Sequence, residues 1–544
     1  MENIPATPPL AGPATPPEGP SAPPEPTPAP PPGEAPPPAP EPPPPPPPPR
    51  PFPPASPVPS SPSSALASSG PSLGPPPPPP PPSAPPPVPP GGGPRGNTLD
   101  RIRGLIRPLF VVVVLLIIGF LAVTLLSLDF CGLPVVGNLL CGQRDVELTY
   151  WGLWEDADIV QPMLDDFVEA YQTEHPGVSV TISYEKRSFG SLDQYRETLL
   201  TRLQQGTAPD VFRIHNSWAE EFSSELEALP TGILSEEEYA LRFYPAALAS
   251  ARVGTDIYAL PLEYDGLVVF YNEALFSGVN VAETIQTWED FRREAVRLTT
   301  WENNDAARGR IMRSGAALGT AANVSHSSDL LGLFFAQSGI DPLTDLETQA
   351  AADALTFYTN FSTKDRVWDS TLPFSINAFA NGQVAMIIAP SWRALDILNL
   401  NPQLEFSAIQ VPQLPAAEEG GTHWATFWME GVSRDSDNAA VAWELLEFLT
   451  REEQQRTFFA TASQVRIFGE PYARRSLAEE LSENDLLAPL LASAPFAVSS
   501  KTADFSGYTA YADALKQAVA DVLAGTAPAE ALQTAQATLS QLEQ

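Results

Sequence analysis

The feature that most constrains this chain is an apolar run near residue 110 that carries no charge. The stretch "PLFVVVVLLIIGFLAVTLLSL", from Pro108 to Leu128, holds about 21 residues, enough to cross a hydrocarbon core of about 30 Å. A buried core helix of that length would normally show a polar stripe. The run therefore predicts a transmembrane helix over 104–128, and it separates two flanks of different chemistry.

The charges beside this run predict its orientation. Arginines precede it and Asp129 follows it; the arginines are Arg95, Arg101, Arg103 and Arg107. The positive-inside rule then places the N-terminus in the cytoplasm and the C-terminal flank outside the cell. The run is too long and too far from the N-terminus for an ordinary signal peptide. We expect a single-pass membrane protein.

Proline dominates the N-terminal flank. Residues 1–100 hold about 47 of the 65 prolines, in tracts such as "GPPPPPPPPSAPPPVPPGGGP". Proline lacks an N–H group and these tracts contain few large apolar side chains, so they cannot build a core. We expect a disordered cytoplasmic tail that favours polyproline II. It could be a ligand for proline-reading domains or a simple spacer.

The C-terminal flank is strongly acidic and has the composition of a globular protein. The whole chain has a formal charge of −35, of which about −33 falls after residue 145. Phosphate contacts need clustered Lys and Arg, so binding of nucleic acid is excluded. The two cysteines, Cys131 and Cys141, lie in the expected linker 129–145, either as a disulfide or as separate thiols.

Residues 146–215 alternate between strand and helix patterns. "VELTYWGL" reads as a strand, "IVQPMLDDFVEAYQTEH" as an amphipathic helix and "PGVSVTISYE" as a second strand. A helix ending near Gly206 and the strand "APDVFRIH" follow. This order predicts a parallel sheet, in which ligands bind at the carboxyl ends of strands. Trp151 ends the first strand, and Trp154 lies in the loop beyond it.

Motifs of catalysis are missing from the sequence. The glycines do not form a phosphate loop, and no HExxH pattern involves any of the four histidines. "SHSSD" at 325–329 lacks a nucleophile elbow, and paired carboxylates are too common in so acidic a chain to single out. We therefore expect no enzyme activity and no cofactor or metal.

Four segments resemble, in order, the extracellular solute-binding proteins of ABC importers, the family that includes the maltose-binding protein. They are "LTYWGLWED" with "PGVSVTIS", then "LLTRLQQGTAPDVFRI", then "YALPLEYDGLVVFYNEALF" with "TWEDFRREAVRL", and last "FSINAFANGQVAMIIAPSW". "GVSRDSDNAAVAWELLEFLTREEQQRTF" resembles the two-helix segment that follows them in the family. The resemblance covers about 146–544.

The resemblance implies an α/β, two-lobed, periplasmic-binding-protein-like fold of type II over 146–544. Lobe 1 would comprise about 146–262 and 431–474, and lobe 2 about 263–430 and 475–544. We expect the chain to cross between lobes near Pro261–Glu263 and near Trp428–Gly431. Local reasons support some motifs: Asn272 should cap the helix of "NEALF", and Asp210 should be structural.

The resemblance also implies a function: capture of a carbohydrate outside the cell and delivery to an ABC permease with its ATPase subunits. A surface sensor or glycan-capture protein with the same fold is the alternative. The residues that match ligand-contacting positions of sugar-binding members are Trp154, Glu155, Asp265, Asn323, Ser325, His326, Trp392, Trp424 and Tyr508, although Tyr511 competes with Tyr508 for its position. Trp392 matches a stacking tryptophan, and Trp154 is expected at the mouth of the cleft.

Arginines near the expected cleft leave the charge of the ligand open. They are Arg187, Arg213, Arg393 and Arg466. Arginine binds carboxylates in a bidentate manner, so two of them in one cleft would indicate an acidic sugar. They could instead pair with the abundant acidic side chains.

Overall fold

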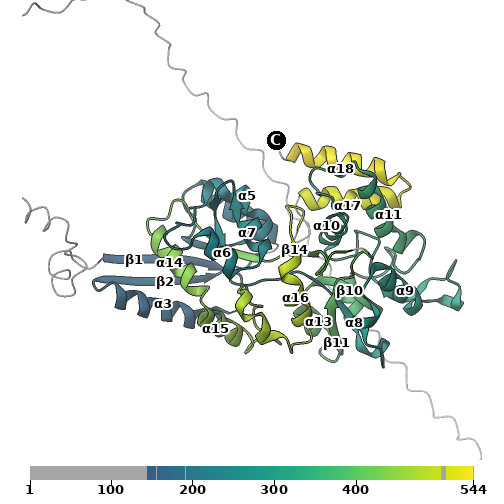
Figure 1. Ribbon diagram of the computed structural model, residues 1–544, viewed down its shortest axis with the longest axis horizontal. Helices are drawn as coiled ribbons and strands as arrows, with labels where there is room; N and C mark the ends of the chain where they lie inside the picture. The colour runs from purple at the N-terminus through teal and green to yellow at the C-terminus, as the bar shows by residue number, and fades with distance from the viewer. Residues whose placement is uncertain (1–143, 155, 190–191, 416, 504–509, 543–544) are drawn as a thin grey trace, which may run out of the picture. The chain divides into compact units, whose positions relative to one another are not determined.

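The computed structural model describes residues 144–154, 156–189, 192–415, 417–503 and 510–542. They form two five-stranded sheets, each packed against helices (Figure 1). The predicted transmembrane segment 104–128, the proline-rich tail and both cysteines lie outside these residues. Among the described residues, no helix is both long enough and apolar enough to cross a bilayer.

The first sheet has the strand order β2-β1-β3-β13-β6. Its strands are β1 (Arg144–Gly152), β2 (Val178–Lys186), β3 (Val211–His215), β6 (Ala259–Leu260) and β13 (Trp428–Val432). β1 runs parallel to β2 and β3, which confirms the parallel arrangement predicted from the sequence. β13 is antiparallel to β3 and to β6, so a late segment of the chain lies between two strands that precede it by more than 160 residues.

The first lobe consists of this sheet and the helices packed with it. These are α3 (Gln161–Glu174), α4 (Leu192–Gln204), α5 (Ala219–Phe222), α6 (Glu236–Arg242), α7 (Pro245–Ala251), α14 (Ala439–Leu449) and α15 (Glu452–Ala462). Gly206 follows α4 with a φ of 64°, the left-handed conformation that glycine adopts at helix ends. Asp210 accepts hydrogen bonds from Thr149 and Ser436, so it joins β1 to the segment after β13. Its predicted structural role is therefore visible.

The second sheet has the strand order β11-β7-β10-β9-β8. Its strands are β7 (Leu267–Asn272), β8 (Thr300–Trp301), β9 (Ile311–Ala316), β10 (Val384–Pro390) and β11 (Phe406–Gln410). Every residue of β10 is buried, as its continuous apolar sequence "VAMIIAP" requires. Asn272 caps a 3-10 helix, Glu273–Leu275, by accepting a hydrogen bond from the N–H of Ala274, as predicted.

The second lobe consists of this sheet and its helices. These are α8 (Val281–Thr284), α9 (Trp288–Leu298), α10 (Ser327–Gln337), α11 (Gln349–Thr363), α12 (Ser375–Ala380), α13 (Arg393–Leu400), α16 (Ala488–Ser493), α17 (Ala510–Leu523) and α18 (Pro528–Leu542). α17 and α18 pack against each other and against α11 (Figure 1). The short pairs β4 (Arg252–Val253) with β5 (Asp256–Ile257), and β12 (His423–Trp424) with β14 (Ala497–Val498), complete the strands.

Three segments cross between the lobes and lie side by side; we call residues 261–266, 425–427 and 470–472 the crossing segments. Gly266 pairs with Ala425, and the N–H of Thr426 donates to the carbonyl of Asp265 (3.1 Å). The third segment joins through the N–H of Tyr264, which donates to the carbonyl of Pro471 (3.0 Å). The second crossing therefore precedes the expected Trp428–Gly431, because those residues already belong to β13 of the first sheet.

We expect Gly266→Ala to destabilise the protein. A Cβ at this position would lie 2.5 Å from the carbonyl oxygen of Trp424, and that backbone is fixed by the pairing of Gly266 with Ala425. Such overpacking should lower the free energy of unfolding by about 1–3 kcal/mol in urea denaturation. Gly232→Ala is the matched control, because its Cβ would meet no atom within 4 Å. Equal stability of the two variants would contradict this packing.

Candidate ligand-binding cleft

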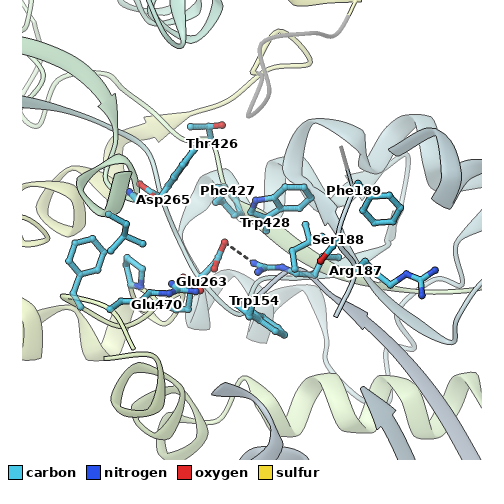
Figure 2. A pocket seen from close by; sticks show the side chains of 17 residues that line it. Trp154, Arg187, Ser188, Phe189, Glu263, Asp265, Thr426, Phe427, Trp428 and Glu470 are labelled. Carbon is cyan, nitrogen blue, oxygen red and sulfur yellow. Dashed lines mark hydrogen bonds and ion pairs between the residues drawn. The ribbon is translucent and has the colours of Figure 1, made fainter. Parts of the chain in front are cut away.

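A cleft of about 500 Å³ lies at the crossing segments and draws its walls from both lobes. Figure 2 shows Phe189 and Arg187 on the side opposite Asp265. The residues that line it are Leu153, Trp154, Arg187, Ser188, Phe189, Arg213, Glu263, Asp265, Trp392, Leu395, Thr426, Phe427, Trp428, Arg466, Phe468, Glu470 and Pro471. Among the described residues, no group of histidines and acids is placed to hold a metal ion.

Two segments supply acidic and aromatic side chains to the walls of the cleft. Arg466, Phe468 and Glu470 line it from the stretch that follows α15, which begins with turns and bends, whereas Val465 and Ile467 of the same stretch are 56% and 55% exposed. Glu263 and Asp265, two apart on the first crossing segment, both line the cleft, because alternate residues of an extended segment point to the same side.

Trp154 lies in the floor of the cleft, and not at its mouth as the sequence suggested. Only 1% of the residue is exposed. Its ring stacks on Tyr184 and meets the edge of Phe458, while the guanidinium of Arg213 lies 4.4 Å from the ring centroid. A ring covered in this way offers no free face to a sugar, so Trp154 supports the charged groups above it.

Trp151 lies three residues earlier, on β1, and has different neighbours. Its Nε1–H donates to Glu185 (3.0 Å), and the guanidinium of Arg187 stacks 3.7 Å from its ring centroid. Glu185 also pairs with Arg187 (2.9 Å), which closes a three-residue cluster. Trp151 therefore holds Arg187, a residue of the cleft wall, and does not itself line the cleft.

A buried network of ions occupies the base of the cleft. Arg213, on β3, pairs with Glu263 of the first crossing segment (2.7 Å; Figure 2) and with Glu430 of β13 (3.1 Å). Removing one partner from such a network leaves an uncompensated buried charge, which costs several kcal/mol. The network therefore joins the first lobe to the first crossing segment.

A second arginine completes this network. Arg466 pairs with Glu470 (2.7 Å), and Glu470 shares a hydrogen bond with Glu263. Burial, followed by the nearby charge of Glu470, holds the pKa of Glu263 well above its usual range, against the opposing effect of Arg213. Arg466 in turn keeps the pKa of Glu470 low despite its burial. Of the two carboxyl groups, Glu263 therefore has the higher pKa.

Asp265 lines the cleft, but both of its carboxylate oxygens are already engaged. Oδ1 accepts from the N–H of Gly266 (2.6 Å) and of Ser391 (2.8 Å). Oδ2 accepts from the hydroxyl of Ser391 (3.0 Å) and from the N–H of Trp392 (3.0 Å). Burial raises the pKa of Asp265 to about 7, and these four hydrogen bonds oppose the rise.

Trp392 lies at the start of α13 and lines the cleft, where the sequence placed it. The guanidinium of Arg393 stacks 3.9 Å from the centroid of its ring. Arg393 also donates from Nε to Nε2 of His326 (2.9 Å) and pairs with Asp396 (2.7 Å). Because Nε2 of His326 accepts, its proton lies on Nδ1, which faces Asp329 (3.1 Å).

The other residues proposed for lobe 2 lie behind the lining. Asn323 uses its amide to bind Trp368, Thr320 and two backbone carbonyls, and it is buried. The N–H of Ser325 donates to Ser375, and the buried His326 supports Arg393. Trp424 is 1% exposed and donates to Asp329 (2.8 Å). The structure thus does not bring these four residues to the cleft surface.

Glu155 and Tyr508 lie outside the described residues, so their predicted contacts stay predictions. Sequence reasoning missed the lining residues Phe189, Phe427, Phe468 and Glu470. Glu470 follows Arg466 by four residues, a spacing that could have suggested the pair. The three phenylalanines carry no such signal, because only the fold distinguishes them from core residues.

Two α/β lobes joined by three crossing segments, with an aromatic and charged cleft where they meet, define a two-lobed binding protein. The sequence profile described as "Bacterial extracellular solute-binding protein" matches residues 156–456, and the chain belongs to this family.

Solved structures share the fold. A solute-binding protein of an ABC transporter from Thermotoga lettingae TMO, bound with α-D-tagatose, is 21% identical, with a TM-score of 0.55 over 73% of this chain and 99% of that chain. The cyclic α-maltosyl-1,6-maltose binding protein from Arthrobacter globiformis is 18% identical, with a TM-score of 0.58 over 73% and 99%. A substrate-binding protein from Listeria monocytogenes in complex with cycloalternan is 18% identical, with a TM-score of 0.54 over 74% and 99%.

Stability should depend on pH through Glu430. Burial raises the pKa of this group to about 7, because the ion pair with Arg213 offsets only part of the desolvation. The folded protein then holds the proton more tightly than the unfolded chain, so stability decreases as the pH rises from about 4.5 to about 7. Relative to Glu430→Gln, which cannot titrate, the wild type should lose roughly 1–3 kcal/mol over this interval in urea unfolding. A difference that stays constant with pH would contradict this assignment.

Proposed function

We propose that this chain is a membrane-anchored solute-binding protein of an ABC importer that captures an uncharged carbohydrate in the cleft. The family is one of extracellular binding proteins. The observation that carries the ligand class is the composition of the cleft wall, where aromatic rings and paired polar groups face the same space. The solved structures of related fold that bind tagatose, cyclic maltosyl-maltose or cycloalternan support this choice.

The cleft offers both kinds of contact that a sugar requires. A sugar ring has an apolar C–H face and a polar rim, and a buried hydroxyl without a partner costs roughly 1–3 kcal/mol. Trp392 and Phe189 are partly exposed aromatic residues in the lining. Ser188, Thr426 and the Arg213 network supply donors and acceptors beside them.

The arginines favour an uncharged ligand, a point that the sequence left open. Each of the four already has an acidic partner: Arg187 with Glu185, Arg213 with Glu263 and Glu430, Arg393 with Asp396, and Arg466 with Glu470. An acidic sugar would have to displace one of these carboxylates or lie beside it. A neutral hydroxyl can instead donate to the carboxylate and accept from the guanidinium of one pair.

The anchor and the delivery step complete the proposal. Residues 104–128 would hold the binding domain, about 146–544, outside the cell. Ligand would favour the closed arrangement of the lobes, because it contacts both walls only when they approach. Separate permease and ATPase subunits would be the partners. The proline-rich tail supports one alternative function, that of a surface sensor or glycan-capture protein. A permease gene next to the gene of this chain would favour transport over this alternative.

A thermal-shift panel on the full-length chain tests the proposed function. Neutral mono- and oligosaccharides, uronates, amino acids and polyamines would be compared, since a ligand stabilises the folded state more strongly when its affinity and concentration are higher. We expect stabilisation by at least one neutral sugar and none by its uronate. Stabilisation only by polyamines or only by uronates would overturn the proposed ligand class.

Replacing Trp392 with alanine should weaken binding of the active sugar by about tenfold or more, the usual effect of truncating a central tryptophan. Calorimetric titration measures the affinity. Trp301→Ala is the matched control, because Trp301 is a partly buried tryptophan of the same lobe whose Nε1–H donates to the carbonyl of Arg366, away from the cleft. Unchanged affinity of Trp392→Ala would remove this residue from the site.

A further inference from the structure

The carboxylate of Asp265 has no capacity left for a ligand. An ionised carboxylate offers about four acceptor positions, two on each oxygen. Four donors already fill them: the N–H groups of Gly266, Ser391 and Trp392 and the hydroxyl of Ser391. A sugar hydroxyl would have to replace one of these bonds, three of which come from backbone N–H groups.

The four donors to Asp265 belong to two separate segments of the chain. Gly266 belongs to the first crossing segment, whereas Ser391 and Trp392 connect the end of β10 to the start of α13. The backbone carbonyl of Asp265 also accepts from Thr426 of the second crossing segment (3.1 Å). One residue therefore links two crossing segments to the backbone that carries Trp392.

We propose that Asp265 is a positioning residue: it fixes Trp392 against the crossing segments and does not itself contact the ligand. This differs from the role that the sequence resemblance implies, a direct contact with sugar. The effect on affinity rests on the proposed function, but the effect on Trp392 does not.

Asp265 holds the backbone of Trp392, and a second group of residues holds its ring. Arg393 stacks on the ring, and His326 and Asp329 hold Arg393 in a chain of hydrogen bonds. Asp265 thus fixes the backbone of Trp392, and Arg393 fixes its ring, before a ligand binds. Preorganisation of this kind raises affinity because less conformational freedom is lost on binding.

The variant Asp265→Asn replaces one acceptor oxygen of the side chain with an amide group that donates. The asparagine oxygen can still accept from Gly266 and Ser391, but its amide nitrogen carries hydrogens toward the N–H of Trp392. Two donors then face each other at the point where Asp265 holds this residue. Asp210→Asn is the matched control, since Asp210 also accepts from a backbone N–H and from hydroxyls, those of Thr149 and Ser436, outside the cleft.

Fluorine NMR of the full-length chain labelled with 5-fluorotryptophan tests the positioning without any ligand. The resonance of Trp392 is identified by its absence from the Trp392→Phe variant. We expect Asp265→Asn to shift or broaden this resonance and Asp210→Asn to leave it unchanged. An unchanged Trp392 resonance in folded Asp265→Asn would overturn the proposal. Ser391→Ala, which removes only the hydroxyl donor, should give a smaller shift and serves if Asp265→Asn does not fold.

A double-mutant cycle then separates positioning from direct contact. We expect Asp265→Asn to weaken binding of the sugar from the panel by about tenfold in the wild type. In the Trp392→Ala background it should change affinity by less than about twofold, because Asp265 acts through the residue that is missing. Equal losses in both backgrounds would show that Asp265 acts on the ligand independently. If no sugar binds at all, the proposed function fails, whereas the fluorine result still decides the positioning.

Discussion

The backbone hydrogen bonds between the crossing segments determine where the cleft lies and which side chains reach it. Gly266 pairs with Ala425, and Tyr264 bonds to Pro471, so three distant parts of the chain form one narrow layer. Extended segments in such a layer present alternate side chains to one side. Glu263 and Asp265 both reach the cleft for this reason.

Electrostatics then shape what this cleft can hold. The chain is strongly acidic, yet the base of its cleft contains two arginines, Arg213 and Arg466, which pair with Glu263, Glu430 and Glu470. Burial makes each of these groups dependent on its partners, because an isolated charge at such depth is costly. Such a cleft should accommodate hydroxyl groups, which both donate and accept hydrogen bonds, better than the charge of an acidic ligand.

Much of the fold could be predicted from the sequence. The strand and helix order of residues 146–215 followed from periodicity alone, and the roles of Asn272, Asp210 and Gly206 followed from local chemistry. The late return of β13 into the first sheet could not, because pairing across more than 200 residues leaves no local signal. The second crossing was accordingly placed a few residues too late.

Only part of the candidate site could be predicted from the sequence. Trp392 was placed at the cleft, but Trp154, Asn323 and Trp424 lie beneath or behind the surface that they were expected to form. Sequence patterns indicate that a residue is near a site, whereas the hydrogen-bond partners decide whether it faces the ligand. Asp265 shows this most clearly, since its position is in the lining and its acceptors are all used by the protein.

The crystal structure of the chain bound to the sugar that stabilises it most would test directly whether an uncharged sugar binds in the cleft without contacting Asp265. We expect a sugar between the lobes, with an apolar face on Trp392, hydroxyls on the Arg213 and Arg466 pairs, and Asp265 still bonded to Ser391 and Trp392. A sugar bound outside the cleft, or one that displaces the acidic partners of these arginines with its own carboxylate, would contradict this expectation.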